Sequence, residues 1–159
     1  MKYPIVATEA PALRHRFVDK IALVYAGFIV VMLLTQLFTF ESWLELVVAM
    51  DITTSLGGGY LIAGLVVGIE LLALPFLLRM YLSPAFRWLS MIFGWLVGAL
   101  WLFFSQWTMT VTPEFENVGF FGTIVEISPG WWAIVLSFVM LAVSSVIIWG
   151  MGPELRRRL

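Results

Sequence analysis

The sequence contains no cysteine and a single histidine, His15. Without cysteine, the chain can form neither disulfides nor zinc–thiolate sites nor iron–sulfur clusters. One histidine is too few for a bis-histidine haem or a histidine-rich metal site within one chain. The sequence therefore predicts no metal site.

Charged residues are also scarce. They make up 12% of the 159 residues, whereas hydrophobic residues make up 62%. Soluble domains carry roughly 25% charged residues. Because so few charges cannot cover the surface of a short folded chain, we expect lipid rather than water to surround most of it.

The sequence instead contains long hydrophobic runs. A membrane-spanning helix needs about 20 mostly apolar residues. Four segments meet this requirement, at about 21–40, 60–82, 87–108 and 131–151. They predict an all-α membrane protein, an antiparallel bundle of four transmembrane helices over residues 21–151. Segment 1–20 precedes the bundle, and a basic tail, 152–159, follows it.

The bases all fall at one side of this arrangement. They are Lys2, Arg14, Arg16, Lys20, Arg79, Arg87, Arg156, Arg157 and Arg158. The outer connections, 41–59 and 109–130, contain acids and no base. Since bases favour cytoplasmic loops, both termini are expected in the cytoplasm, with the chain in the plasma (inner) membrane of a prokaryote.

The two outer connections differ in composition. The first has apolar residues Trp43, Leu44, Val47 and Val48, a spacing compatible with a short helix in the membrane interface. The second contains "TMTV" and "TIVEI" around the turn residues "ENVG", which predicts a small extracellular β-hairpin cap. Phe115, Phe120 and Phe121 would form its apolar underside. The cap either docks onto a partner or only covers the bundle.

One acid, Glu70, lies within an apolar span. No charged residue occurs in the eighteen positions before it or the eight after it. Its place in the second span puts it about 15 Å deep, near the middle of the hydrocarbon layer. A charge facing lipid there is costly, so Glu70 is expected to face the bundle interior and to find a hydrogen-bond donor.

Donors at matching depth are few. Ser144 and Ser145 lie nearest to the midplane, and Tyr25 lies closer to the inner side. Thr35, Gln36, Ser105 and Gln106 lie closer to the outer side. No base lies at the depth of Glu70. The acid then either fixes helix packing, binds a proton, a cation or a quinone headgroup, or contacts a partner subunit.

Glycines recur at a spacing of four in two consecutive spans, as Gly64 and Gly68 and as Gly94 and Gly98. Small residues at this spacing let helix backbones approach closely. The pattern predicts close packing of the second span on the third.

Catalytic patterns are missing from the sequence. It has no paired intramembrane carboxylates, no HExxH, no phosphate loop and no Ser/His/Asp set. The terminal Arg156, Arg157 and Arg158 are expected to anchor the topology and bind anionic lipid headgroups. Binding of nucleic acid is not expected.

Residues 63–94, "AGLVVGIELLALPFLLRMYLSPAFRWLSMIFG", combine an intramembrane Glu–Leu pair, a short basic turn and a third apolar span. With the four-span plan, they resemble the DoxX/MauE-type small membrane proteins. The resemblance implies a four-helix membrane protein linked to thiosulfate:quinone oxidoreduction or to thiol redox maturation. The lack of cysteine argues against the thiol role, and the long second outer loop departs from the family pattern.

The function expected first is that of a non-catalytic accessory or assembly subunit of a larger membrane complex, respiratory or redox-linked. Its partners would be the lipid bilayer and other membrane subunits, or further copies of the chain. One alternative is a small proton- or solute-coupled carrier that uses Glu70. Another is a DoxX-like, quinone-reactive oxidoreductase subunit, and quinone is the one cofactor left open.

Overall fold

The computed structural model describes residues 6–13, 15–53, 55–111 and 115–152. These residues form five helices, namely α1 (Arg16–Phe38), α2 (Phe40–Ala49), α3 (Leu56–Leu77), α4 (Pro84–Thr110) and α5 (Trp131–Met151). Four of them, α1, α3, α4 and α5, are long and apolar enough to cross a membrane. The chain is thus an all-helical integral membrane protein, as its composition predicts.

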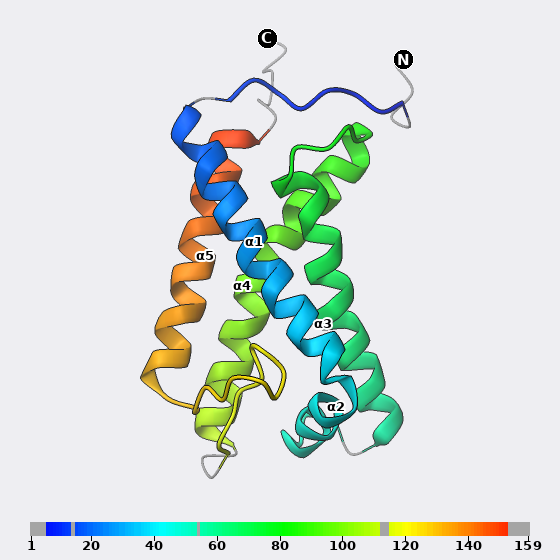
Figure 1. The fold of residues 1–159 in the computed structure, drawn as a ribbon, viewed down its shortest axis with the longest axis vertical. Helices are drawn as coiled ribbons and strands as arrows, with labels where there is room; N and C mark the ends of the chain where they lie inside the picture. Colours follow the sequence, from blue (N-terminus) through cyan, green and yellow to red (C-terminus); the bar gives the residue numbers. More distant parts are fainter. Residues whose placement is uncertain (1–5, 14, 54, 112–114, 153–159) are drawn as a thin grey trace.

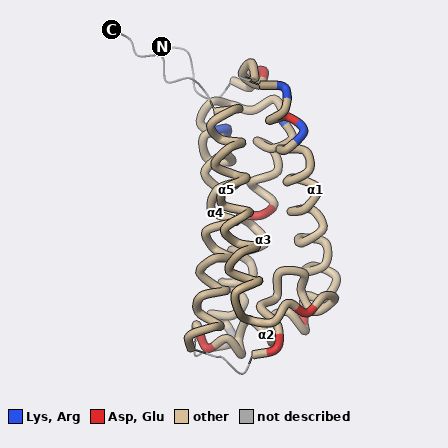
Figure 2. The backbone as a smooth tube through the Cα atoms, turned by 90° about the vertical axis from the view of Figure 1, so that its left-hand side faces the viewer, with Lys and Arg blue, Asp and Glu red and all other residues tan. Residues whose placement is uncertain are grey.

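The bundle has two unlike ends (Figure 1). At one, here called the terminal end, lie segment 6–13, the α3–α4 turn and the last turn of α5. At the other, the loop end, lie α2 and the loop 115–130. Figure 2 shows the described Lys and Arg residues at the terminal end, with Asp and Glu at both ends and within α3.

Local sequence signals account for the helix starts at α3 and α4. The Ser55 side chain accepts a hydrogen bond from Gly58 N, and Ser83 accepts one from Phe86 N. Each serine thus caps an N-terminus by satisfying an amide that has no partner in the helix. Pro84 follows Ser83 as the first residue of α4, where a missing N–H costs nothing.

Pro75 interrupts the hydrogen bonding of α3, and Ser90 of α4 repairs it. The Ser90 hydroxyl accepts from Phe76 N at 3.0 Å and donates to the Leu72 carbonyl at 2.6 Å. A regular helix would join those two groups to each other. Ser90 therefore satisfies backbone groups that a proline would otherwise leave unpaired, and this polar contact fixes α4 against α3.

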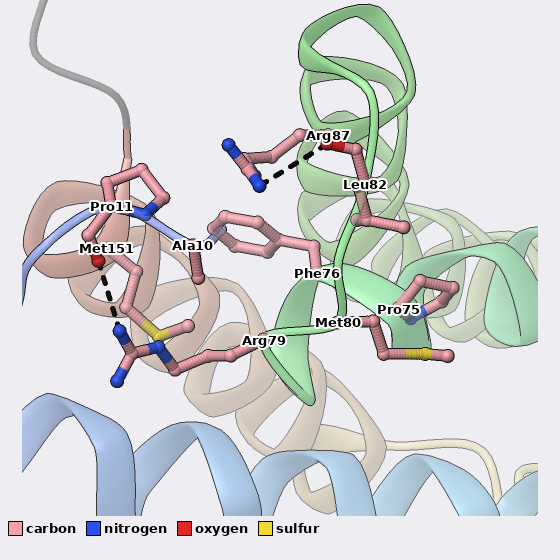
Figure 3. Close-up of a pocket in the computed structure, with 9 residues that line it drawn as sticks. All are labelled: Ala10, Pro11, Pro75, Phe76, Arg79, Met80, Leu82, Arg87 and Met151. Carbon is pink, nitrogen blue, oxygen red and sulfur yellow. Dashed lines mark hydrogen bonds between the residues drawn. The ribbon is translucent and has the colours of Figure 1, made fainter. Parts of the chain in front are cut away.

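Segment 6–13 is held across the terminal end by two arginines. Thr8 and Leu82 exchange two backbone hydrogen bonds. Buried Arg87 donates to the carbonyls of Thr8 at 2.7 Å and Glu9 at 3.0 Å. Arg79 donates to the Pro11 carbonyl at 3.1 Å, and Figure 3 shows both arginines beside a small hollow.

The predicted β-hairpin is not found among the described residues. Of "TMTV", the first three residues continue α4, and the loop 115–130 contains one isolated bridge, between Phe121 and Val125. The Asn117 side chain explains the difference, because its Oδ1 accepts from Gly119 N and Ile127 N. A side chain thus satisfies amides that a strand partner would otherwise have satisfied. The cap is an irregular loop.

The glycine pairs do not act as predicted. A Cβ added at Gly64, Gly68 or Gly94 would meet no atom of a neighbouring helix within 4 Å. One added at Gly98 would lie 2.8 Å from the Leu141 backbone nitrogen. Helices α3 and α4 do pack closely, as predicted, but these three glycines are not at the contact, and the one glycine of the two pairs that a neighbouring backbone approaches, Gly98, lies between α4 and α5.

Candidate functional site

Glu70 lies inside the bundle, on α3, with 1% of its surface exposed. Its Oε1 accepts hydrogen bonds from Trp101 Nε1 of α4 at 2.9 Å and from Gln36 Nε2 of α1 at 3.3 Å. Both donors are neutral. The acid thus joins three membrane helices without an ion pair.

The loop 115–130 completes the site. Gln36 Nε2 also donates to the Phe120 carbonyl at 3.0 Å. The Phe120 ring stacks on Trp101, with centroids 4.4 Å apart and planes inclined by 19°. Glu70, Gln36, Trp101 and Phe120, here called the Glu70 cluster, therefore hold α1, α3, α4 and the loop together.

Two glycines with left-handed backbone let the loop reach this position. Gly119 has φ +90° and Gly122 has φ +61°, a region that side chains rarely adopt. Gly122 lies against the end of α1, because a Cβ there would be 2.9 Å from the Thr35 carbonyl. The neighbouring Thr123 N donates to Thr39 Oγ1 at 3.2 Å. These contacts fix the loop 115–130 on α1 and place Phe120 in the interior of the bundle.

Two oxygens of the Glu70 cluster have no hydrogen-bond partner in the described part of the chain. They are Glu70 Oε2 and Gln36 Oε1, and both are buried. Buried acceptors without donors destabilise a fold by about 1–3 kcal/mol each. A proton on Glu70 turns one of its oxygens into a donor, so the cluster is chemically suited to hold a proton.

The sequence identifies some of these residues and not others. Gln36 is among the predicted donors and bonds Glu70. Ser144 and Ser145, predicted to lie nearest, both donate instead to the Leu141 carbonyl. Trp101 is not among the predicted donors, although it gives the shorter hydrogen bond to Glu70. Its ring nitrogen is the missed signal, because a buried indole N–H usually finds an acceptor.

The loop phenylalanines and the basic tail can also be placed. Phe120 is fully buried, and Phe121 meets Phe28 of α1 edge-on at 5.6 Å. Phe115 is half-buried. The loop thus covers the bundle with its apolar side chains, and buried Phe120 offers no surface for docking. Arg156, Arg157 and Arg158 lie outside the described residues.

Three surface hollows of the described chain have no residue of the Glu70 cluster in their lining. One is beside Arg79 and Arg87, another lies between α1 and α5, and a third is beside Asn117 at the loop end. Within the described ranges, no group of three or more His, Asp or Glu residues is placed to hold a metal ion. The Glu70 cluster is thus enclosed and presents no group to an outside solute.

Comparison of the chain with models of protein families, with curated proteins and with solved structures gives no match.

Proposed function

We propose that this chain is a non-catalytic accessory or assembly subunit of a larger membrane complex. The observation that carries the proposal is the enclosure of its intramembrane polar site. Glu70 is 1% exposed, and its contacts tie α1, α3, α4 and the loop together. A side chain used in this way stabilises the bundle and leaves the outer helix faces for function.

Those outer faces carry many large apolar side chains, among them Leu61 and Leu65 of α3 and Phe138 of α5. Such faces suit lipid and unlike membrane subunits equally. The bases at the terminal end support an orientation with that end in the cytoplasm, across a prokaryotic inner membrane. A redox-linked complex is supported by the resemblance of residues 63–94 to DoxX/MauE-type proteins.

Site-specific photocrosslinking in native membranes tests this proposal. A photoreactive phenylalanine analogue is placed at exposed Leu61 or Phe138, and at buried Phe104 as the matched control. An exposed position at an interface should give a discrete adduct with an unlike membrane protein, identified by mass spectrometry. The control should give none. If exposed positions on all four long helices crosslink only to lipid or to copies of the chain, the proposal is wrong.

A second candidate is a proton-coupled carrier that uses Glu70. The unpartnered oxygens Glu70 Oε2 and Gln36 Oε1 favour it, because a proton bound there would satisfy a buried group. Enclosure argues against it, since protons or solutes would need a route that opens to Glu70.

Replacing Glu70 with glutamine separates the two functions. Glutamine keeps an acceptor for Trp101 and Gln36 and removes the ionisable group. We expect Glu70→Gln to retain the fold and the assembled complex. Glu70→Ala is the contrasting variant and should lower the free energy of unfolding by about 1–3 kcal/mol, because two buried donors lose their acceptor. Loss of proton-driven uptake into vesicles by Glu70→Gln, with assembly intact, would establish the carrier instead.

A further inference from the structure

An almost wholly apolar groove lies between α1 and α5 and faces out of the bundle. Its volume is about 370 Å³, within the range of small-molecule sites. It is lined by Phe17, Lys20, Ile21, Val24, Tyr25 and Phe28 of α1 and by Leu136, Val139, Met140 and Val143 of α5. The Tyr25 hydroxyl points inward to the Gly94 carbonyl, so Lys20 supplies the groove's one charged group.

The groove is closed at both of its ends. Towards the terminal end, α1 and α5 touch, because a Cβ on Gly150 would overlap the Val18 side chain. Towards the loop end, the edge-on contact of Phe28 with Phe121 closes the groove. From residue 17 to residue 28 the groove runs about 17 Å along α1. A helix spanning about 30 Å of hydrocarbon does not fit such a length, whereas part of an acyl chain does.

Unpaired positive charge lies at the terminal end of this groove. Lys20 and Arg16 are exposed one turn apart on the same face of α1. The nearby acid Asp19 is bound elsewhere, to Arg79 at 3.5 Å. In the described part of the chain, no hydrogen bond or ion pair engages Lys20 or Arg16. Exposed Trp149 follows at the same level on α5, next to Gly150, as is typical of the headgroup region.

We propose that this groove binds one anionic phospholipid, with an acyl chain between α1 and α5 and the phosphate at Lys20 and Arg16. The apolar lining excludes water from the chain, and the two bases select the negative headgroup. The site is independent of the Glu70 cluster, and it stands whether or not the chain belongs to a complex.

Lipid selectivity of the purified full-length protein tests the charge. Dioleoyl phosphatidylglycerol and dioleoyl phosphatidylcholine carry the same chains, and bound lipid is counted by native mass spectrometry. Each base near a headgroup contributes about fivefold in affinity, so about 25-fold preference for phosphatidylglycerol is expected. The double variant Lys20→Gln, Arg16→Gln should lower this preference to what the remaining bases give, and Lys20→Arg should keep it. Equal retention of both lipids by the unaltered protein, or a preference that the double variant leaves unchanged, overturns the proposal.

A second pair of variants tests whether the lipid binds in this groove. Val24→Trp puts a large ring at the groove rim, where Val24 is 74% exposed, and Leu61→Trp does the same at a 76% exposed position on α3. Both sites are on the surface, so both proteins should fold. Only Val24→Trp should lose most of the bound phosphatidylglycerol. Equal effects of the two variants overturn the proposal, as does a protein chain crosslinked at Val139 in place of lipid.

Discussion

Replacing Trp101 with alanine is expected to lower the free energy of unfolding by about 3–5 kcal/mol through the cavity alone. The indole is 1% exposed, stacks on Phe120 and meets Phe104 edge-on. Its loss also removes the shorter hydrogen bond to Glu70 Oε1, which costs about 1–3 kcal/mol more. Denaturation of the purified protein in mixed micelles measures the change.

Two further variants separate the contribution of the Trp101 ring to stability from that of its N–H group. Trp101→Phe keeps an aromatic ring against Phe120 and removes the donor, so the smaller part of the loss is expected. Trp95→Ala, on the same helix at a 40% exposed position, is the matched control and should cost little. If Trp101→Ala destabilises no more than Trp95→Ala, the Glu70 cluster does not hold the bundle together.

The four spans could be predicted from the sequence because composition alone decides them. An apolar run of about 20 residues has few stable alternatives to a membrane helix. The helix ends could not be predicted as well. Helix α1 begins at Arg16 rather than near residue 21, because the charged residues Asp19 and Lys20 fit a helical turn outside the hydrocarbon. Helix α4 includes Pro84, since proline is tolerated in a first turn.

The candidate site was predictable in part. The cost of a lipid-exposed acid places Glu70 inside the bundle. Gln36 is one of seven polar residues that the sequence offers as donors, and depth places it closer to the outer side than the serines of the fourth span. Depth does not tell how each helix is rotated about its axis. Helix α5 packs on α1 and α4, so Ser144 and Ser145 do not reach the acid that lies at their level. The position of Phe120 depends on Asn117 and on two left-handed glycines. The sequence marks Asn117 and Gly119 as turn residues, but it does not show that the Asn117 side chain takes the place of a strand partner.

The glycine spacing indicates that small residues allow close helix packing, but it does not show which of the glycines the packing needs. An added Cβ at Gly98 would lie 2.8 Å from the nitrogen and 3.0 Å from the Cα of Leu141, and backbone atoms cannot rotate away. We therefore expect Gly98→Ala to force α4 and α5 apart and to destabilise the fold by about 1–3 kcal/mol. Gly98→Leu should prevent folding of the bundle.

Alanine at Gly64 and at Gly68 provides the matched controls, because a Cβ at either position meets no neighbouring helix. Alanine is favoured over glycine in a helix by about 1 kcal/mol, so both controls should leave stability unchanged or raise it. Chemical denaturation of the three single variants in the same micelles gives the comparison. A larger loss at Gly64 or Gly68 than at Gly98 would mean that the glycines of α3 do contribute to its contact with α4, as the sequence spacing predicts. The structure instead predicts the largest loss of stability at Gly98, because the backbone contact of α4 with α5 leaves no room there for a side chain.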